Sequence, residues 1–412
     1  MGGGLMQLVA YGAQDIYLTG NPQITFFKVV YRRHTNFAME SIQQSPTGTQ
    51  NYDQTATYTI SRTGDLVGRM YVEHDVKGPT NDPDVSGVCS AYGNSLLKEV
   101  TVEIGGQQID KHYGHWLETW AELTEPNPTG EVGALASGVR TGTLYQRMSG
   151  NTKADKDVSG DTVQEKMFIP LQFWFNRNPG LALPLIALQY HEVKVVITFE
   201  KQSKLMDIEG SAATSLTSNF ALWADYIYLD TDERRRFAQV SHEYLIEQLQ
   251  KNNATTTNGN VTANLTFNHP VKELVVVPDA SGTDVGDLTE HNGPAVAAKG
   301  WENSGKMQLK LNGQDRFAAR KMFYFTRTQV WQHHTGYGGT QQRDSIAVYS
   351  FALKPEEHQP SGTCNFSRID NAQLALTDNA LGAGNNLPIT IYAVNYNVLR
   401  IMSGMGGLAY SN

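Results

Sequence analysis

Histidine is the residue type in this chain whose spacing comes nearest to a metal site. The candidate ligands are His112, His115, His191, His242, His333 and His334. A metal site on a β-strand needs two imidazoles on alternate residues, because only such residues share a face of the strand. No pair among them has that spacing, and the His-Glu sequences at 191–192 and 242–243 lack the second His of a zinc-protease motif. The sequence therefore predicts no catalytic metal.

Motifs for nucleophilic or phosphate chemistry are also missing. The chain has no Gly-x-Ser-x-Gly sequence and no phosphate-binding loop. Its glycine-rich stretches at 105–107 and 404–407 are followed by neither Lys nor a helical pattern, so we interpret them as turns. The basic cluster 234–236 could contact a phosphate or a partner, but we favour a solvated link paired with neighbouring acids. Those acids are Asp230, Asp232 and Glu233. We predict that the protein is not an enzyme and has no cofactor.

Charge and composition argue against nucleic-acid binding. The 412 residues include 33 Lys and Arg against 41 Asp and Glu, a net charge of −8. A general nucleic-acid binder needs a basic face, so direct nucleic-acid binding is not expected. Only 18% of residues are charged, against about 25% in an average domain. This favours a surface covered by other subunits, although an ordinary β-rich monomer stays open.

The two cysteines and the apolar runs indicate the cellular compartment in which the protein is made. Cys89 and Cys364 are far apart in sequence, and we expect both to be free thiols in a reducing compartment. No apolar run reaches the roughly 18 residues that span a bilayer. The start of the chain lacks the basic region of a secretory signal. We therefore expect a chain without a membrane span that stays in the cell that makes it.

The elements that carry these residues repeat along the chain. Five pairs of similar segments occur in the same order, starting at His34 and His242, Thr57 and Asn264, Val102 and Leu309, Phe173 and Ser350, and Leu222 and Ile391. The spacing within the first three pairs is the same to within one residue, and the spacing within the last pair is clearly shorter. The first copy therefore contains extra loop residues. The common order predicts an internal duplication.

Each copy has the pattern of antiparallel β-structure. Alternating or apolar runs of strand length occur at 66–76, 100–104, 193–199, 222–229, 274–277 and 389–398. Long loops are predicted at 77–94, 125–161, 203–219, 279–304 and 333–343. About 200 residues per copy suits an eight-stranded sandwich with long loops. We predict an all-β chain of two consecutive eight-stranded antiparallel jelly rolls with few short helices.

Two short helices and four regions complete the prediction. Residues 115–123 place Trp116, Leu117, Trp120 and Leu123 on one helical face, which we assign to core packing. Residues 231–236 form a short helical link. The predicted regions are an N-terminal arm (1–26), jelly roll 1 (27–230), a linker (231–241) and jelly roll 2 with a C-terminal tail (242–412). The arm either orders against a neighbouring subunit or folds on its own.

Six long stretches carry a family resemblance: 8–33 (LVAYGAQDIYLTGNPQITFFKVVYRR), 179–193 (PGLALPLIALQYHEV), 242–250 (HEYLIEQLQ), 311–317 (LNGQDRF), 360–371 (PSGTCNFSRIDN) and 396–410 (YNVLRIMSGMGGLAY). These stretches resemble the major capsid proteins of large icosahedral DNA viruses, in particular those of phycodnaviruses, which include the chlorella viruses. They extend from one end of the chain to the other.

The resemblance implies a double jelly roll that trimerises into pseudo-hexagonal capsomers. It implies contacts with neighbouring capsomers and with minor capsid and penton proteins, over an internal viral membrane. It also implies assembly in the host cytoplasm, incorporation into the virion and no catalysis. Related proteins carry glycans on loop asparagines outside the common triplet. The loop candidates here are Asn292, Asn303, Asn385 and Asn386.

Two other functions remain open for a pair of jelly rolls. One is a bicupin-type metalloenzyme, which would need bound metal. The other is a glycan-binding module, which would need exposed aromatic side chains in the loops. Tyr92, Trp301 and Tyr337 are the candidates for such a site.

Overall fold

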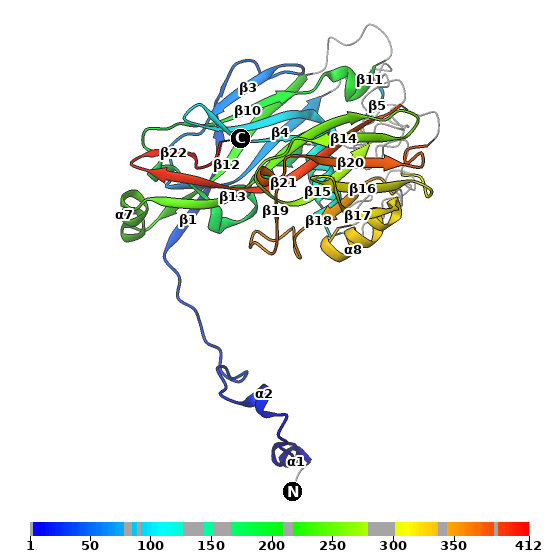
Figure 1. The fold of residues 1–412 in the computed structure, drawn as a ribbon. Helices are drawn as coiled ribbons and strands as arrows, with labels where there is room; N and C mark the ends of the chain where they lie inside the picture. The colour runs from blue at the N-terminus through cyan, green and yellow to red at the C-terminus, as the bar shows by residue number, and fades with distance from the viewer. Residues whose placement is uncertain are drawn as a thin grey trace. The chain divides into compact units, whose positions relative to one another are not determined.

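The computed structural model describes residues 3–77, 85–88, 92–126, 144–150, 166–208, 217–278, 301–336, 344–382 and 386–411. The chain forms two compact units, Met1–Asn36 and Phe37–Asn412. The first unit contains two short helices, α1 (Gly3–Val9) and α2 (Ile16–Thr19), neither of which buries a side chain. The second unit contains the sheets (Figure 1).

The first sandwich has two sheets. One has the order β1 (Phe37–Gln44), β12 (Thr217–Leu229), β4 (Leu66–Lys77), β8 (Met167–Pro170), with β9 (Leu183–Pro184) also paired to β4. The other has the order β2 (Pro46–Thr47), β3 (Thr55–Thr59), β10 (Val193–Phe199), β6 (Leu97–Ile104), β7 (Gln107–Tyr113). Strands β5 (Val85–Val88) and β11 (Met206–Ile208) form a small separate sheet.

The second sandwich repeats this arrangement. One sheet has the order β13 (His242–Thr255), β21 (Pro388–Met402), β15 (Pro270–Pro278), β18 (Ala347–Ser350), with β19 (Cys364–Asn365) on β15 and β22 (Met405–Leu408) on β21. The other has the order β14 (Val261–Leu265), β20 (Ala372–Thr377), β16 (Lys306–Leu311), β17 (Gln314–Lys321). In each sandwich the first sheet takes the first, eighth, third and sixth main strands, which is the jelly-roll order.

Short helices connect the strands. The α-helices are α3 (Tyr92–Leu96), α4 (Gly114–Thr124), α5 (Leu144–Ser149), α6 (Trp174–Arg177), α7 (Thr231–Gln239) and α8 (Gln329–His333). The 3-10 turns are η1 (Pro179–Leu181), η2 (Leu185–Ala187), η3 (Gln202–Lys204) and η6 (Phe366–Arg368), and η4 (Tyr324–Thr328) is a π-helical turn. The two predicted helices are confirmed as α4 and α7. Asp230 precedes α7, and its carboxylate accepts a hydrogen bond from Thr231 N.

Strand register confirms the duplication. Glu40 lies opposite Tyr226 in the first sandwich, and Gln248 lies opposite Asn395 in the second. The spacing from Glu40 to Gln248 equals that of the first pair of similar segments in the sequence, and the spacing from Tyr226 to Asn395 equals that of the last pair. The two copies therefore share strand pairing as well as strand order.

The hairpins β6–β7 and β16–β17 are equivalent in detail. Gln107 and Gln314 each begin the second strand after a two-residue turn. Both turn residues have positive φ in each hairpin, at 105–106 and at 312–313, as a type I′ turn requires. Next to the turn, the pairing skips one residue in each hairpin, leaving Ile109 in β7 and Arg316 in β17 as equivalent bulge residues. Further along, the β16–β17 pair has a second irregularity between Met307 and Leu309 that the β6–β7 pair lacks.

Two of the predicted long loops contain short strands that pair with each other. The loop 77–94 includes β5 and the start of α3, and the loop 203–219 includes η3 and β11. Strands β5 and β11 pair with each other, which periodicity could not indicate because each strand is short. The described parts of the other predicted loops include α5 and the end of α8. Cys364 is a half-buried free thiol, and Cys89 lies outside the described residues.

Two apolar clusters form the cores of the sandwiches, and the first also contains Ile246, Leu399 and Ile401 from the second copy. The first core includes Val100, Val102 and Val195, and the second includes Leu274, Leu309 and Leu374. The third cluster joins α4 of the first copy to the second copy. Within the described part of the chain, no helix is long and apolar enough to cross a membrane.

Candidate functional site: the junction between the two sandwiches

Helix α4 of the first sandwich covers the outer face of a second-sandwich sheet. Trp116 and Trp120 pack with Val275, Val277 and Val394 in one buried cluster. The Trp116 ring centroid lies 5.0 Å from that of Tyr392. The predicted packing role of the apolar stripe is confirmed, but the Trp residues fill the space between two sandwiches. Leu117 instead faces the core of the first sandwich.

Strand β13 docks on the bulge in β7. The amide Nε2 of Gln248 donates to the carbonyl oxygen of Ile109, the bulge residue. The backbone N–H of Leu249 donates to Asp110 Oδ1 over 3.0 Å. A bulge leaves one backbone group outside the strand ladder. Here the second sandwich satisfies that group, so the bulge aligns the two sandwiches.

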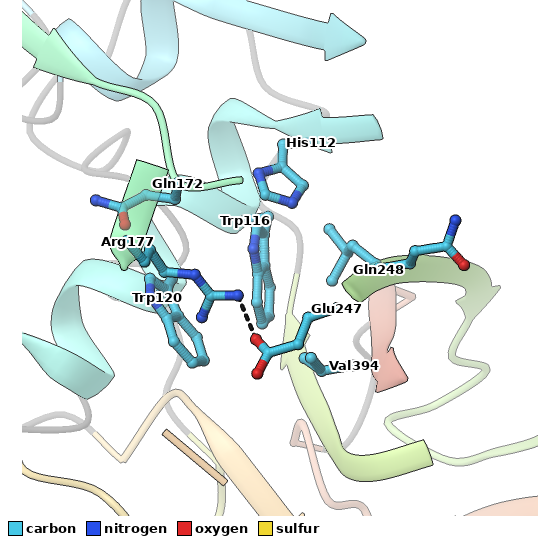
Figure 2. Close-up of a pocket in the computed structure, with 9 residues that line it drawn as sticks. His112, Trp116, Trp120, Gln172, Arg177, Glu247, Gln248 and Val394 are labelled. Atoms are coloured by element: carbon cyan, nitrogen blue, oxygen red, sulfur yellow. Dashed lines mark hydrogen bonds and ion pairs between the residues drawn. The ribbon is translucent and has the colours of Figure 1, made fainter. Parts of the chain in front are cut away.

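A buried ion cluster lies beside this contact and consists of Arg177, Glu247, Lys272 and His358. Figure 2 shows Arg177, from α6 of the first sandwich, paired with Glu247 of β13. Lys272 Nζ lies 2.8 Å from the other carboxylate oxygen of Glu247. Both side chains are buried, and that of Lys272 has 0% exposure. The cluster therefore joins the sandwiches through Arg177, which keeps 24% side-chain exposure, and the buried carboxylate of Glu247.

The electrostatics keep the Glu247 carboxylate ionised. Burial alone would raise the pKa of Glu247, but Arg177, His358 and Lys272 outweigh it and hold that pKa far below its usual range. Burial lowers the pKa of Lys272, while Glu247 opposes this change. A carboxylate held by this many cations has no proton to exchange near neutral pH. This arrangement suits a structural ion pair rather than general acid–base catalysis.

A second polar contact involves His334. Its two ring nitrogens lie 3.0 Å from Glu273 Oε2 and 3.0 Å from Glu356 Oε1. Burial would lower the pKa of His334, but the two carboxylates outweigh burial and raise it to about 9. The next residues reach the first sandwich, because Gly336 N donates to the carbonyl oxygen of Leu123 over 2.7 Å. The end of α4 is therefore capped by the second copy.

The C-terminal hairpin also contacts the first sandwich. Tyr190 N donates to the carbonyl oxygen of Gly404 over 2.9 Å, and His191 Nδ1 lies 2.9 Å from the carbonyl oxygen of Gly406. A Cβ atom at Gly406 would lie 2.6 Å from Leu188 Cδ2. Glycine is needed here for close approach, so the stretch 404–407 forms a turn and a docking strand.

The candidate metal ligands are dispersed among structural contacts. His112 lies 3.0 Å from Asp110, and His115 Nδ1 lies 2.7 Å from the hydroxyl of Tyr392. The ring nitrogens of His242 and His333 contact the carbonyl oxygens of Phe237 and Leu353. Throughout the described residues, no three His, Cys, Asp or Glu side chains could together hold a metal ion.

Two of the three aromatic residues proposed for glycan binding are wrong for that role. Tyr92 is buried, and its hydroxyl lies 2.8 Å from that of Tyr52. Trp301 is also buried, and its Nε1 donates to the carbonyl oxygen of Ser345. Both side chains belong to the interior because their rings bury large apolar areas. Tyr337 lies outside the described residues.

Two of the four predicted glycan positions are on the surface. Asn303 is exposed in the turn before β16, and Asn386 is exposed before β21. Asn292 and Asn385 lie outside the described residues. In the basic cluster, Arg234 pairs with Asp65 over 3.0 Å. Asp65 belongs to the first sandwich and was not among the acids predicted as its partners.

The buried ion cluster was missed because charge pairs usually indicate a solvated face. One signal was available. Lys272 and Glu273 interrupt a strand that is otherwise apolar from Val271 to Val277. A charged pair inside a strand buried on both faces must have partners, because unpaired buried charges are strongly unfavourable. That argument would have predicted a contact with another part of the protein.

Comparison with known proteins agrees with this architecture. Residues 25–230 match the family described as major capsid protein N-terminus. Residues 233–407 match the family described as large eukaryotic DNA virus major capsid protein. The chain is 52% identical to the major capsid protein of Pyramimonas orientalis virus and 43% identical to that of Paramecium bursaria Chlorella virus 1, and each match covers 100% of both proteins.

Solved structures show the same likeness. The fold matches a chain of a quasi-atomic model of the PBCV-1 virus capsid with a TM-score of 0.77 and 38% identity. That match covers 94% of this chain and 100% of the other. The Faustovirus major capsid protein has the same fold, with a TM-score of 0.68 at 14% identity over 95% and 94% of the two chains. The chain therefore belongs to the major capsid proteins of large eukaryotic DNA viruses, which are structural proteins of the virion shell and not enzymes.

Proposed function

We propose that the protein works as a homotrimer that forms one capsomer with a pseudo-hexagonal outline. The observation that carries this proposal is the pair of sandwiches with equal strand order and register, joined by a buried junction. Three such chains place six similar sandwiches around one threefold axis. This unit can tile a hexagonal lattice while obeying the closed symmetry that most homo-oligomers have.

Exposed apolar side chains support an assembled state. Phe37 and Met39 on β1, Trp331 on α8 and Leu353 after β18 are all more than half exposed. Apolar groups that gather on a surface often mark an interaction site. The covered surface should fall in the obligate range, above about 2,000 Å² for each contact.

The domain division is part of the proposal. We assign residues 1–26 to an arm, 27–230 to jelly roll 1, 231–241 to a linker, and 242–412 to jelly roll 2 with its tail. The arm includes Leu8, Tyr17 and Phe26, whose side chains are exposed. A segment that buries none of its own apolar groups is suited to order against a neighbouring subunit.

The wider contacts follow from the proposed capsomer. Its sides would contact neighbouring capsomers, and its base would contact minor capsid and penton proteins above an internal viral membrane. Assembly would take place in the host cytoplasm, and none of these contacts requires direct nucleic-acid binding. We also propose glycans on loop asparagines, and Asn303 and Asn386 have the exposure that modification needs. Asn292 and Asn385 are the other two candidates.

Light scattering on gently purified protein tests the oligomer. A trimer should scatter with three times the mass of the 45.5 kDa chain, and this threefold mass should persist on dilution to micromolar concentration. A stable species of 45.5 kDa at that concentration would contradict the proposal. Peptide mass spectrometry of protein from virions tests the asparagines, since unmodified peptides at all four positions would remove the glycan assignment.

A further inference from the structure

We propose that the contact between neighbouring chains repeats the junction found inside each chain. The bulge of β17 in one copy would dock on β1 of a second copy, as the bulge of β7 docks on β13 within the chain. This inference rests on the proposed trimer and names the surfaces that form it. We define the bulge face as Arg316, Trp331 and Leu353, and the acceptor face as Met39, Glu40, Tyr71, Phe168 and Trp223.

Strand register identifies the equivalent residues. The bulge residue Ile109 of the first copy corresponds to Arg316, the bulge residue of the second. In the other partner, Gln248 of β13 corresponds to Glu40 of β1. The internal hydrogen bond between Gln248 and Ile109 therefore places Glu40 of one chain beside Arg316 of the next.

The two copies differ in what covers these positions. In β7, Ile109, Asp110 and His112 are buried under the second sandwich. In β17, seven of eight residues are exposed, and only Phe317 is half-buried. β1 is likewise exposed over most of its length, whereas its equivalent β13 buries Ile246, Glu247 and Gln248. Each copy thus leaves uncovered the surface that its counterpart covers.

The sheet faces show the same asymmetry. Strand β15 is buried on both faces because α4 covers its outer side. In β4 the burial alternates between Tyr71 and Asp75, so the outer face is only partly covered. In the second sandwich Val275 lies opposite Tyr392, and in the first sandwich Tyr71 lies opposite Trp223. The strand register makes these two cross-strand pairs equivalent. The outer face of the first sandwich is therefore equivalent to the face of the second sandwich that α4 covers, but no helix of the described chain covers it in the same way.

The uncovered outer face has the composition of an interface. The rings of Tyr71 and Trp223 are stacked with centroids 6.4 Å apart, and Phe168 meets Tyr71 edge-on at 5.9 Å. Aromatic residues are enriched at protein interfaces. Trp223 Nε1 is shielded from solvent and lacks a hydrogen-bond partner among the described residues, and a buried indole N–H usually has one. A second subunit could supply the acceptor.

The two faces are complementary in charge and in apolar groups. The strand β17 carries Arg316, Arg320 and Lys321 beside one acid, Asp315, whereas the acceptor side carries Glu40, Glu73 and Asp225, of which Glu73 already pairs with Lys166. The residue Glu247, which pairs internally with Arg177, corresponds to Met39. The similar segments starting at Phe173 and Ser350 align Arg177 with Lys354. Met39 of one chain would therefore meet the segment of the next chain that holds Lys354 and its neighbour Leu353, and an apolar contact would form between Met39 and Leu353. Their side chains are 57% and 76% exposed.

The positions of the faces suit a closed ring. Within residues 37–412, Figure 1 shows β1 on the left of the body and β17 with α8 on the right. A contact between two different faces is heterologous, and such contacts form a ring when the rotation closes. Two sandwiches per chain and one repeated contact give a ring of six sandwiches from three chains.

Site-specific photo-crosslinking tests the contact on the full-length chain. Met39 is replaced by benzoylphenylalanine, and the labelled chain is assembled with ¹⁵N-labelled unsubstituted chain. Crosslinked peptides that join the two isotopic forms should connect position 39 to residues 314–333 or 350–356. The probe at Val240, which is also exposed, provides the control and should give no crosslinks to these segments.

Charge reversal supplies the second measurement. Glu40→Arg and Arg316→Glu should each weaken assembly more than about tenfold, because like charges would then face each other. The double variant should recover assembly toward the original value. Glu243→Arg reverses an exposed charge on β13 and should change assembly less than about threefold.

The outcomes separate this inference from the proposed trimer. A trimer without these crosslinks, or with no recovery in the double variant, would overturn the repeated junction and leave the trimer in place. A monomer at micromolar concentration would overturn both. Crosslinks from position 39 to its own chain alone would also reject the contact between chains.

Discussion

Removing the carboxylate of Glu247 should destabilise the junction strongly. In Glu247→Ala, Lys272 would lose its main counter-charge in a site where its side chain has 0% exposure. Breaking a buried ion pair by removing one partner costs about 3–5 kcal/mol, mainly because the other charge remains buried. Arg177 retains 24% side-chain exposure and can regain water, and Glu273 still attracts Lys272. We therefore expect the lower end of this range, about 3 kcal/mol.

A second substitution should recover much of that loss. Lys272→Met removes the isolated charge and fills the same space with an unbranched apolar side chain. Replacing buried ion pairs with apolar residues of similar volume is often neutral or stabilising. The double variant should therefore be more stable than Glu247→Ala alone, although it contains more changes.

Thermal unfolding and hydrogen exchange measure this effect together. For a domain near 200 residues, about 1 kcal/mol shifts the melting temperature by about 2–4 °C, so Glu247→Ala should lower it by about 6–12 °C. Because two sandwiches need not unfold in one step, exchange in peptides from α4 and β15 should report the junction directly. The matched control is Glu243→Ala on the same strand. The partner of Glu243, Arg400, is about half exposed. Glu243→Ala should therefore lower the free energy of unfolding by less than about 1 kcal/mol.

Two results would refute the reasoning. One is a loss of unfolding free energy in Glu247→Ala that is no larger than the loss in Glu243→Ala. The other is a double variant no more stable than the single variant. Either result would mean that water or another carboxylate compensates Lys272, and that the buried ion cluster does not hold the sandwiches together.

The other predictions concern pH, packing and thiols. The His334 pKa is raised from 6.5 to about 9, so its stabilising effect is complete below pH 6.5 and is lost as the pH rises through 9. Melting temperature should fall over that interval, and the fall should be smaller in His334→Gln; equal falls would contradict the assignment. Gly406→Val should lower the free energy of unfolding by about 1–3 kcal/mol, measured by chemical denaturation, because the new Cβ meets Leu188. Gly407→Ala should lower it clearly less. Equal losses in the two variants would contradict the need for glycine at position 406. Cys364 and Cys89 should alkylate as two free thiols in intact-mass measurements on unreduced protein, and a disulfide-linked peptide would show otherwise.

The fold was most predictable from the sequence where a strand or hairpin pattern occurs in both halves of the chain. The spacing between the similar segments at His34 and His242 agrees with the register of β1 and β13, because insertions accumulate in loops and leave paired strands intact. The helix around Trp116 and Trp120 was predictable from its spacing. Its location between two sandwiches was not, because an apolar stripe does not identify the surface it covers. Short strands such as β5 were missed because their partners come from distant loops.

Comparison of the two copies extends what either copy shows alone. Their topology, register and bulge are equal, so differences in burial at equivalent positions reflect what surrounds each copy. Val275 and Tyr392 are covered by α4, and the sequence around them is apolar. Their counterparts Tyr71 and Trp223 lie among acidic residues and are partly exposed. A face covered within the chain during folding can be largely apolar, with its few charges paired in the interior as Glu273 is with His334. A face that must remain soluble until a second chain arrives needs charge among its aromatic groups, and the first copy has that composition.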